Sequence, residues 1–216
     1  MNERPLPVWD LPVRVFHWSL AVLVVAAVTS VSLGAMEVHE CCGLSILVLV
    51  AARIVWGFMG GTHARFTSFV RGPRAVLEYL RGPREPGEGH NPAGGWSVLA
   101  MLALLLVQAG SGLFNEDDVA FSGPLAHLVG SKLRGVIGEL HEMNFLLLGA
   151  LVALHVLTVL LYRRRGYDLI RPMLDGGRTH DAVRTRPAWL ALLVLLGCAA
   201  ALWLALAAVP KPVVFL

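Results

Sequence analysis

Four histidines of this 216-residue chain lie within or at the mouths of long apolar stretches: His17, His39, His141 and His155. Ionisable side chains are costly inside a bilayer and usually serve a function there. A neutral imidazole can ligate a metal or a heme iron, and it can also relay protons. Any one of these residues alone would be interpreted as a hydrogen-bonded packing residue. Their arrangement therefore decides the interpretation.

Two of these histidines, His141 and His155, share one apolar stretch and are fourteen residues apart. In an α-helix, fourteen residues return to within about 40° of the starting direction and rise about 21 Å along the axis. Both rings therefore project from the same helix face, one near each membrane surface. This spacing suits two hemes stacked across a bilayer, one in each leaflet.

The composition agrees with a membrane location. Hydrophobic residues make up 56% of the chain and charged residues only 15%, whereas a soluble domain carries about 25% charged residues. Five stretches approach the roughly 20 residues that cross a bilayer. They run approximately over Val15–Met36, Cys41–Met59, Trp96–Phe114, Phe145–Tyr162 and Trp189–Val209. The fourth can begin earlier, near Gly138, because GELHEMN continues the helical pattern.

Basic residues are distributed unevenly between the connecting segments. Most of the 18 Lys and Arg residues lie in the N-terminal tail and in segments 60–95 and 163–188. The positive-inside rule places these segments in the cytoplasm. The sequence thus predicts a multi-pass protein of a bacterial inner membrane, with a cytoplasmic N-terminus and a periplasmic C-terminus. Part of segment 60–95, RGPRAVLEYLRG, is predicted to form a short interfacial helix.

Topology also predicts which histidines share a depth. The first stretch runs from inside to outside, so His17 lies at the cytoplasmic level, where His155 also lies. The second stretch runs back, so His39 begins at the level of His141. We therefore expect two pairs, His17/His155 and His39/His141, each supplying the two axial ligands of one b-type heme.

Smaller features accompany these pairs. Arg53 lies fourteen residues after His39, hence on the same helix face and at cytoplasmic depth. A buried arginine needs an anion, and a heme propionate and a lipid phosphate are the two candidates. Gly43 and Gly138 share helix faces with the ligands of the second pair. They would leave room for a flat macrocycle, although ordinary helix packing explains a glycine equally well.

Four motifs resemble, in order, those of the bacterial cytochrome b561 / nickel-hydrogenase cytochrome b family: VWDLPVRVFHW, VHECCGLSILVLVAARIVWGFMGGTHARF, GHNPAGGWSVLAMLALLLVQAGSGLF and LHEMNFLLLGALVALH. The resemblance covers roughly residues 7–174. It implies a four-helix core with two non-covalent b hemes, held by His17, His39, His141 and His155. It also implies electron exchange between a quinone pool and a redox partner, namely a hydrogenase, another dehydrogenase or a c-type cytochrome. Ubiquinone or menaquinone is a candidate ligand near the cytoplasmic heme, with Arg53 and His63 as candidate contacts.

These observations predict an all-α membrane protein, a four-helix transmembrane bundle holding two hemes plus a fifth C-terminal transmembrane helix. The expected parts are the diheme core 1–174, a cytoplasmic linker 175–188 and the additional helix 189–216. The expected function is electron transfer across the membrane, with lipid, quinone and a redox protein as partners. No Ser/His/Asp arrangement, Walker A loop, HExxH, CxxCH or nucleic-acid module occurs, so we assign no catalytic residues and no nucleic-acid partner.

Two alternative functions remain open. The chain could be a stand-alone oxidoreductase acting on quinol or superoxide rather than a subunit of a larger complex. It could also be a heme-free transporter or assembly scaffold that uses buried histidines as a proton relay.

The remaining histidines, His63, His90, His127 and His180, lie between the apolar stretches. Solvated loop histidines are the default interpretation for all four. His63 and His90 belong to segments that resemble the family, so contact with a propionate or a quinone is the second interpretation for those two.

Overall fold

The computed structural model describes residues 6–82, 89–116, 121–179 and 183–210. Within these residues, helices are the only regular elements apart from two isolated β-bridges, and turns and irregular segments connect them. Five helices are long and apolar enough to cross a membrane: α1 (Leu11–Ser32), α2 (Met36–Met59), α5 (Pro92–Gly112), α6 (Ser131–Arg164) and α8 (Ala188–Ala207). The shorter elements are α3 (Phe66–Phe69), α4 (Pro73–Arg81), α7 (Ile170–Asp175) and the 3-10 helix η1 (Ala126–Leu128). The predicted all-helical class with five apolar helices is confirmed.

Several helix boundaries differ from those expected. The first apolar stretch was predicted to continue to Met36, but α1 ends at Ser32 and Met36 begins α2. The break lies at Gly34, whose φ of +68° is a left-handed conformation that glycine adopts without steric cost. Helix α6 is longer than predicted, because polar turns extend it at both ends beyond the part that hydropathy detects. The short helix predicted between Pro73 and Gly82 is confirmed as α4.

Side-chain caps begin two of the long helices. The Oδ1 atom of Asp10 accepts a hydrogen bond from the backbone N–H of Val13 at 2.9 Å. The Oδ1 atom of Asn91 likewise accepts from the N–H of Gly94 at 2.7 Å. Each cap satisfies a backbone donor that the first turn of a helix leaves without a partner. A proline in the first turn of each helix adds the φ angle that a helix requires.

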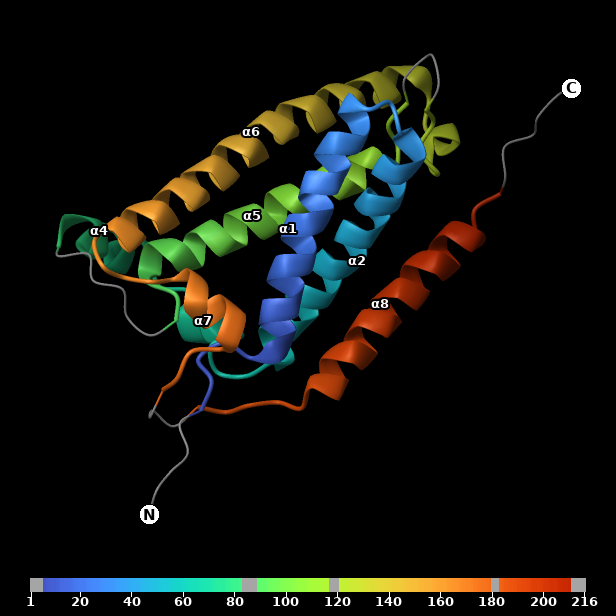
Figure 1. Cartoon of the computed structure of the whole chain (residues 1–216). Coiled ribbons are helices and arrows are strands. Elements are labelled where there is room, and N and C mark those ends of the chain that lie inside the picture. Colours follow the sequence, from blue (N-terminus) through green and yellow to red (C-terminus); the bar gives the residue numbers. More distant parts are fainter. Residues whose placement is uncertain (1–5, 83–88, 117–120, 180–182, 211–216) are drawn as a thin grey trace, which may run out of the picture.

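The long helices run alternately up and down (Figure 1). We call the end of the bundle at which α1 begins the His17 end, and the opposite end the His39 end. Helices α5 and α8 also begin at the His17 end, whereas α2 and α6 finish there. Helix α2 is central because it packs against α1, α5 and α8, while α5 packs against α6. The backbone of helix α6 lies close to that of α5 and mostly farther from those of α1 and α2.

The main core joins four of the five long helices. Its buried members are Ala27, Cys42, Ile46, Val50, Leu102, Leu105 and Leu148. Helix α8 contributes no buried residue and packs mainly on α2, on the side of α1 and α2 away from α6 (Figure 1). The core is thus a property of α1, α2, α5 and α6, and α8 is an outer layer.

The segments before α8 are attached to the rest of the bundle. Backbone hydrogen bonds pair Leu6 with Thr179, at 3.0 and 2.8 Å. The indole N–H of Trp18 in α1 donates to the carbonyl of Met173 in α7 at 3.1 Å. The N–H of Arg184 donates to the hydroxyl of Thr62 at 2.8 Å, beside the end of α2. These bonds set where α8 begins. Residues 180–182 of the expected linker and 211–216 of the expected last helix lie outside the described residues.

The contact between Gly57 and Phe66 predicts a strong effect of a small substitution. The Phe66 ring occupies the position that a Cβ atom on Gly57 would take. We expect Gly57→Ala to displace this ring, at an overpacking cost of about 1–3 kcal/mol. The helix propensity that alanine adds, roughly 1 kcal/mol, should offset only part of this cost. The bundle should therefore become less stable. Thermal unfolding in detergent, followed by circular dichroism, measures the change.

Gly149→Ala is the matched control, because a Cβ at Gly149 on α6 would meet no atom within 4 Å. We expect this variant to be as stable as the original chain or slightly more stable. Equal unfolding midpoints for the two variants would show that Phe66 does not pack tightly on α2.

Candidate functional site

The four histidines of the long helices face one another in two pairs. The ring centres of His17 on α1 and His155 on α6 are 6.4 Å apart, with the ring planes at 57°. The ring centres of His39 on α2 and His141 on α6 are also 6.4 Å apart, with the planes at 76°. One pair lies at each end of the bundle. These are the residues that topology placed at matching depths, and their role as ligands stays a prediction.

The separation within each pair suits a shared metal ion. An ion bonded to one nitrogen of each ring at about 2 Å would hold the ring centres about 6 Å apart. A direct hydrogen bond, with its nitrogen atoms about 3 Å apart, would bring the ring centres to about 5 Å. The observed 6.4 Å is too long for direct proton transfer between the rings. The geometry therefore favours an ion between the imidazoles over a hydrogen-bonded relay.

At the His39 end, hydrogen bonds orient both rings. The Nδ1 atom of His39 lies 2.9 Å from the carbonyl oxygen of Ala27. A carbonyl oxygen can only accept, so Nδ1 carries the proton and the Nε2 lone pair is free. The Nδ1 atom of His141 lies 3.0 Å from the hydroxyl of Ser111, which itself donates to the carbonyl of Gln108. His141 therefore also donates through Nδ1, which leaves its Nε2 with a free lone pair.

The His17 end lacks such a contact. The Nδ1 atom of His17 is buried and has no hydrogen-bond partner among the described residues. A buried polar atom without a partner destabilises a fold, so such an atom in a native structure calls for an explanation. The two pairs thus have the same ring separation but different surroundings.

Glycines beside the His39 end leave open space. A Cβ atom at Gly43 or Gly110 would meet no atom within 4 Å. At Gly112, a Cβ atom would lie 3.2 Å from Cε1 of His141, so a side chain there would crowd that ring. Gly138 differs, because its Cβ position is 3.1 Å from Oδ1 of Asn115. The room expected beside Gly43 is present, whereas Gly138 packs closely against a side chain.

The described residues contain no group of three or more His, Cys, Asp or Glu side chains that could hold a metal ion. A caged ion with several protein ligands therefore has no site in this part of the chain. Facing imidazole pairs suit a group that brings its own equatorial ligands, as a heme does. The donor set, the ring separation and the open space all fit heme.

His63 and His90 are not the solvated loop residues that the default interpretation expected. Both are half-buried, and Nε2 of His63 and Nδ1 of His90 are buried without a hydrogen-bond partner among the described residues. The ring of His90 lies 4.4 Å from that of Phe69 and 4.7 Å from that of Trp9. Burial, reinforced by the charge of Arg53, lowers the pKa of His90 to about 3. His90 is therefore neutral at physiological pH.

The other two loop histidines, His127 and His180, were also expected to be solvated. His127 is exposed, as expected, and its Nε2 atom lies 2.8 Å from the carbonyl of Pro210, beyond the end of α8. This contact links the segment between α5 and α6 to the chain after α8. His180 lies outside the described residues.

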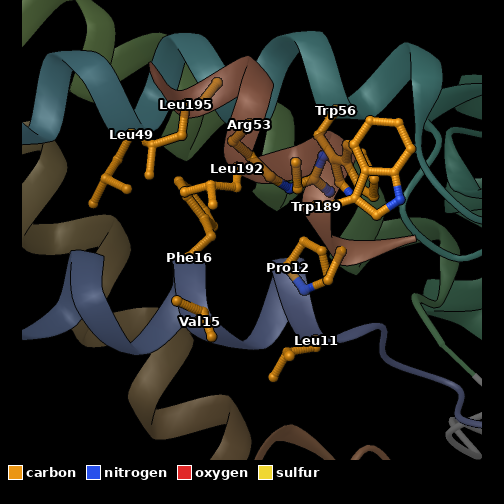
Figure 2. Close-up of a pocket in the computed structure, with 13 residues that line it drawn as sticks. Leu11, Pro12, Val15, Phe16, Leu49, Arg53, Trp56, Trp189, Leu192 and Leu195 are labelled. Atoms are coloured by element: carbon orange, nitrogen blue, oxygen red, sulfur yellow. The ribbon is translucent and has the colours of Figure 1, made fainter. Parts of the chain in front are cut away.

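Arg53 is 4% exposed and its Nη1 atom has no hydrogen-bond partner in the described part of the chain. Its guanidinium carbon lies 5.3 Å from the centre of the Phe66 ring. This is a cation–π distance. Arg53 also lines a cavity between α1, α2 and α8 (Figure 2).

Sequence reasoning missed a group of polar side chains near His141. The side-chain amide of Asn144 donates to Oε1 of Gln108 at 2.6 Å and to the carbonyl of Leu104 at 2.9 Å. Gln108 lies one helical turn before Ser111, and Asn144 one turn after His141. The sequence pattern that could have revealed this group is the spacing of its polar residues, three apart within apolar helices. Polar residues are costly in lipid, so they usually face the interior of a bundle.

Apolar helices enclosing facing histidine pairs define a multi-pass helical membrane protein, the class that includes the membrane cytochromes. Residues 8–176 match the family described as Prokaryotic cytochrome b561, and the chain belongs to that family. It is accordingly a membrane b-type cytochrome that acts in electron transfer. Neither the curated proteins nor the solved structures include one that matches the chain. Helix α8 lies outside the matched residues.

Proposed function

We propose that this protein binds two b hemes and transfers electrons across the bacterial inner membrane, between the quinone pool and a redox partner protein. The partner is a c-type cytochrome or a hydrogenase or other dehydrogenase subunit. The observation that supports this proposal is the repetition of one geometry: two histidine pairs with the same 6.4 Å separation at opposite ends of one bundle.

In this proposal His17 and His155 ligate the heme at the cytoplasmic surface, and His39 and His141 ligate the periplasmic one. Bound heme supplies reversible one-electron oxidation and reduction. At the periplasmic end, Ala27 and Ser111 accept the Nδ1 protons and so aim both Nε2 atoms between the helices.

The bundle holds the two ligand pairs at a fixed spacing. His141 and His155 belong to one continuous helix, whose rise places them about 21 Å apart along the axis. This distance spans most of a hydrocarbon core of about 30 Å. The apolar side chains between the two pairs exclude water and small diffusing reductants.

His63 and His90 supply unused polar atoms at the His17 end. We propose that they donate to the propionates of the cytoplasmic heme or to a bound quinone. The neutral state of His90 suits a hydrogen bond to an anion, because one ring nitrogen then carries a proton and the ring requires no counter-charge. The Trp9 and Phe69 rings hold His90 in place.

Electron transfer across sealed vesicles tests the proposal. The full-length, heme-loaded chain is placed in liposomes that enclose ferricyanide, and an impermeant reductant is added outside. We expect the ferricyanide to be reduced many times faster than in protein-free liposomes. Equal rates in both preparations would rule out transmembrane electron transfer.

Heme content separates this function from the proton-relay alternative. We expect the pyridine hemochrome assay to give two b hemes per chain after heme-replete expression. Purified protein that is folded but lacks Soret absorbance would instead support the heme-free transporter or scaffold.

A further inference from the structure

Helices α1, α2 and α8 enclose a cavity of about 370 Å³ at the His17 end of the bundle (Figure 2). This volume lies within the range of about 300–1,000 Å³ that is usual for small-molecule sites. Its walls are apolar, with Arg53 as the single charged residue among them: Leu11, Pro12, Val15, Phe16, Leu49, Ala52, Arg53, Trp56, Ala188, Trp189, Ala191, Leu192 and Leu195. An occupant must therefore be mostly apolar.

Arg53 lacks the anion that a buried guanidinium requires. Among the described residues, no carboxylate lies within ion-pair distance of it. Asp10 is the nearby carboxylate, but its two oxygens accept hydrogen bonds from the N–H of Val13 and from the indole of Trp56. A charge that is both buried and unpaired is strongly unfavourable. The Asp10 carboxylate offsets the Arg53 charge only from beyond ion-pair distance, so the guanidinium can still pair with an anion from outside the described residues.

The cavity lies on the side of α1 and α2 that faces α8, and its lining includes no histidine of either pair. Helix α8 forms one of its walls and packs on the side of α1 and α2 away from α6, which carries His141 and His155 (Figure 1). Because α8 has no buried residue, the cavity opens towards the space that lipid would fill. Trp189 stands at the first turn of α8, where aromatic rings mark the headgroup level of a bilayer.

We propose that this cavity binds an anionic lipid of the cytoplasmic leaflet, with an acyl chain against α8 and an anionic oxygen group paired with Arg53. The group is a phospholipid phosphate or a fatty-acid carboxylate. A guanidinium forms two parallel hydrogen bonds to either group, and such charge-assisted bonds are strong. The proposal rests on the membrane topology of the proposed function but not on its hemes.

Native mass spectrometry of the full-length chain tests this proposal. Detergent-purified protein is incubated with phosphatidylglycerol, palmitate, phosphatidylcholine or a short-chain ubiquinone, and the retained molecules are counted. We expect one anionic lipid to be retained at least about tenfold more strongly than phosphatidylcholine. The phosphatidylglycerol and palmitate samples distinguish the two anion sources. Equal retention of all four probes, or preferred retention of the neutral quinone, would overturn the proposal.

Two tryptophan substitutions on α8 provide a matched pair. Leu192 lines the cavity, whereas its neighbour Leu193 does not, and both are more than half exposed. We expect Leu192→Trp to fill the cavity and reduce lipid retention about tenfold, while Leu193→Trp retains the lipid. Equal retention by the two variants would place the lipid elsewhere.

Arg53→Gln distinguishes the lipid from a heme propionate as the partner of the guanidinium. We expect this variant to lose its preference for anionic lipid while its heme content stays that of the original chain. A loss of heme with unchanged lipid preference would assign Arg53 to a propionate and refute the lipid site. Hemochrome values for Leu192→Trp and Leu193→Trp report on the proposed function separately, because α8 carries none of the paired histidines.

Discussion

His155→Ala is expected to leave one b heme per chain, against the two proposed for the original protein. In the proposed ligation His155 supplies one of the two iron ligands at the His17 end, so its removal leaves that heme with a single ligand. His141→Ala is expected to remove the other heme, at the His39 end. The pyridine hemochrome assay on purified full-length protein measures the stoichiometry, and the remaining heme should keep its own midpoint potential.

Double variants test the pairing itself. His17→Ala combined with His155→Ala should lose no more heme than either single variant, because both residues belong to one pair. His17→Ala combined with His141→Ala should lose both hemes. The exposed His127 supplies the control, and His127→Ala should bind two hemes. Two hemes retained in either single variant of α6 would disprove the ligand assignment.

Ser111→Ala is expected to raise the midpoint potential of the heme at the His39 end by on the order of 20–60 mV. The Ser111 hydroxyl accepts the Nδ1 proton of His141. This hydrogen bond makes the ring a stronger electron donor and so favours oxidised iron. Without it, the Nδ1 proton of His141 keeps only the backbone of Gln108 as a neighbouring acceptor among the described residues. Redox titration of the Soret band should show one potential shifted and the other unchanged.

The surroundings of the two pairs also predict the order of the two potentials. Both histidines of the pair at the His39 end donate through Nδ1, whereas at the His17 end Nδ1 of His17 has no partner among the described residues. A ring that donates through Nδ1 is the stronger electron donor and favours oxidised iron. The His39-end heme should therefore have the lower potential, which favours electron flow towards the His17 end.

Two further variants act as controls for Ser111→Ala. Ser111→Thr retains the hydroxyl and should restore the original potential. Among the described residues, the Thr158 hydroxyl on α6 donates to the carbonyl of Leu154 in its own helix, so Thr158→Val should shift neither potential. An unchanged titration for Ser111→Ala, with two hemes still bound, would show that the hydroxyl does not tune the ligand.

Most of the fold could be predicted from the sequence because membrane helices depend on local composition. About 20 apolar residues cross a bilayer wherever they occur in the chain, so all five long helices were identified. Their ends were less predictable. The turn at Gly34 depends on backbone conformation rather than on hydropathy, and α6 continues through polar turns that a hydropathy limit excludes.

The histidine pairs could be anticipated for a similar reason. Helical rise and alternating direction fix the depth of each residue, so depth-matching requires no knowledge of packing. His63 and His90 were misjudged because burial of a loop residue depends on which helices lie beside it. Trp9 and Phe69, which enclose His90, come from segments distant in the chain.

The sequence by itself determined the helices, their directions and the depths of the four histidines, since all three follow from composition and helical geometry. Only the tertiary structure decided what each side chain touches. It placed the Ala27 carbonyl and the Ser111 hydroxyl against two ring nitrogens and left Nδ1 of His17 without a partner. It also placed α8 beside Arg53 and so formed the cavity. Such contacts join residues far apart in the chain, and local patterns carry no information about them.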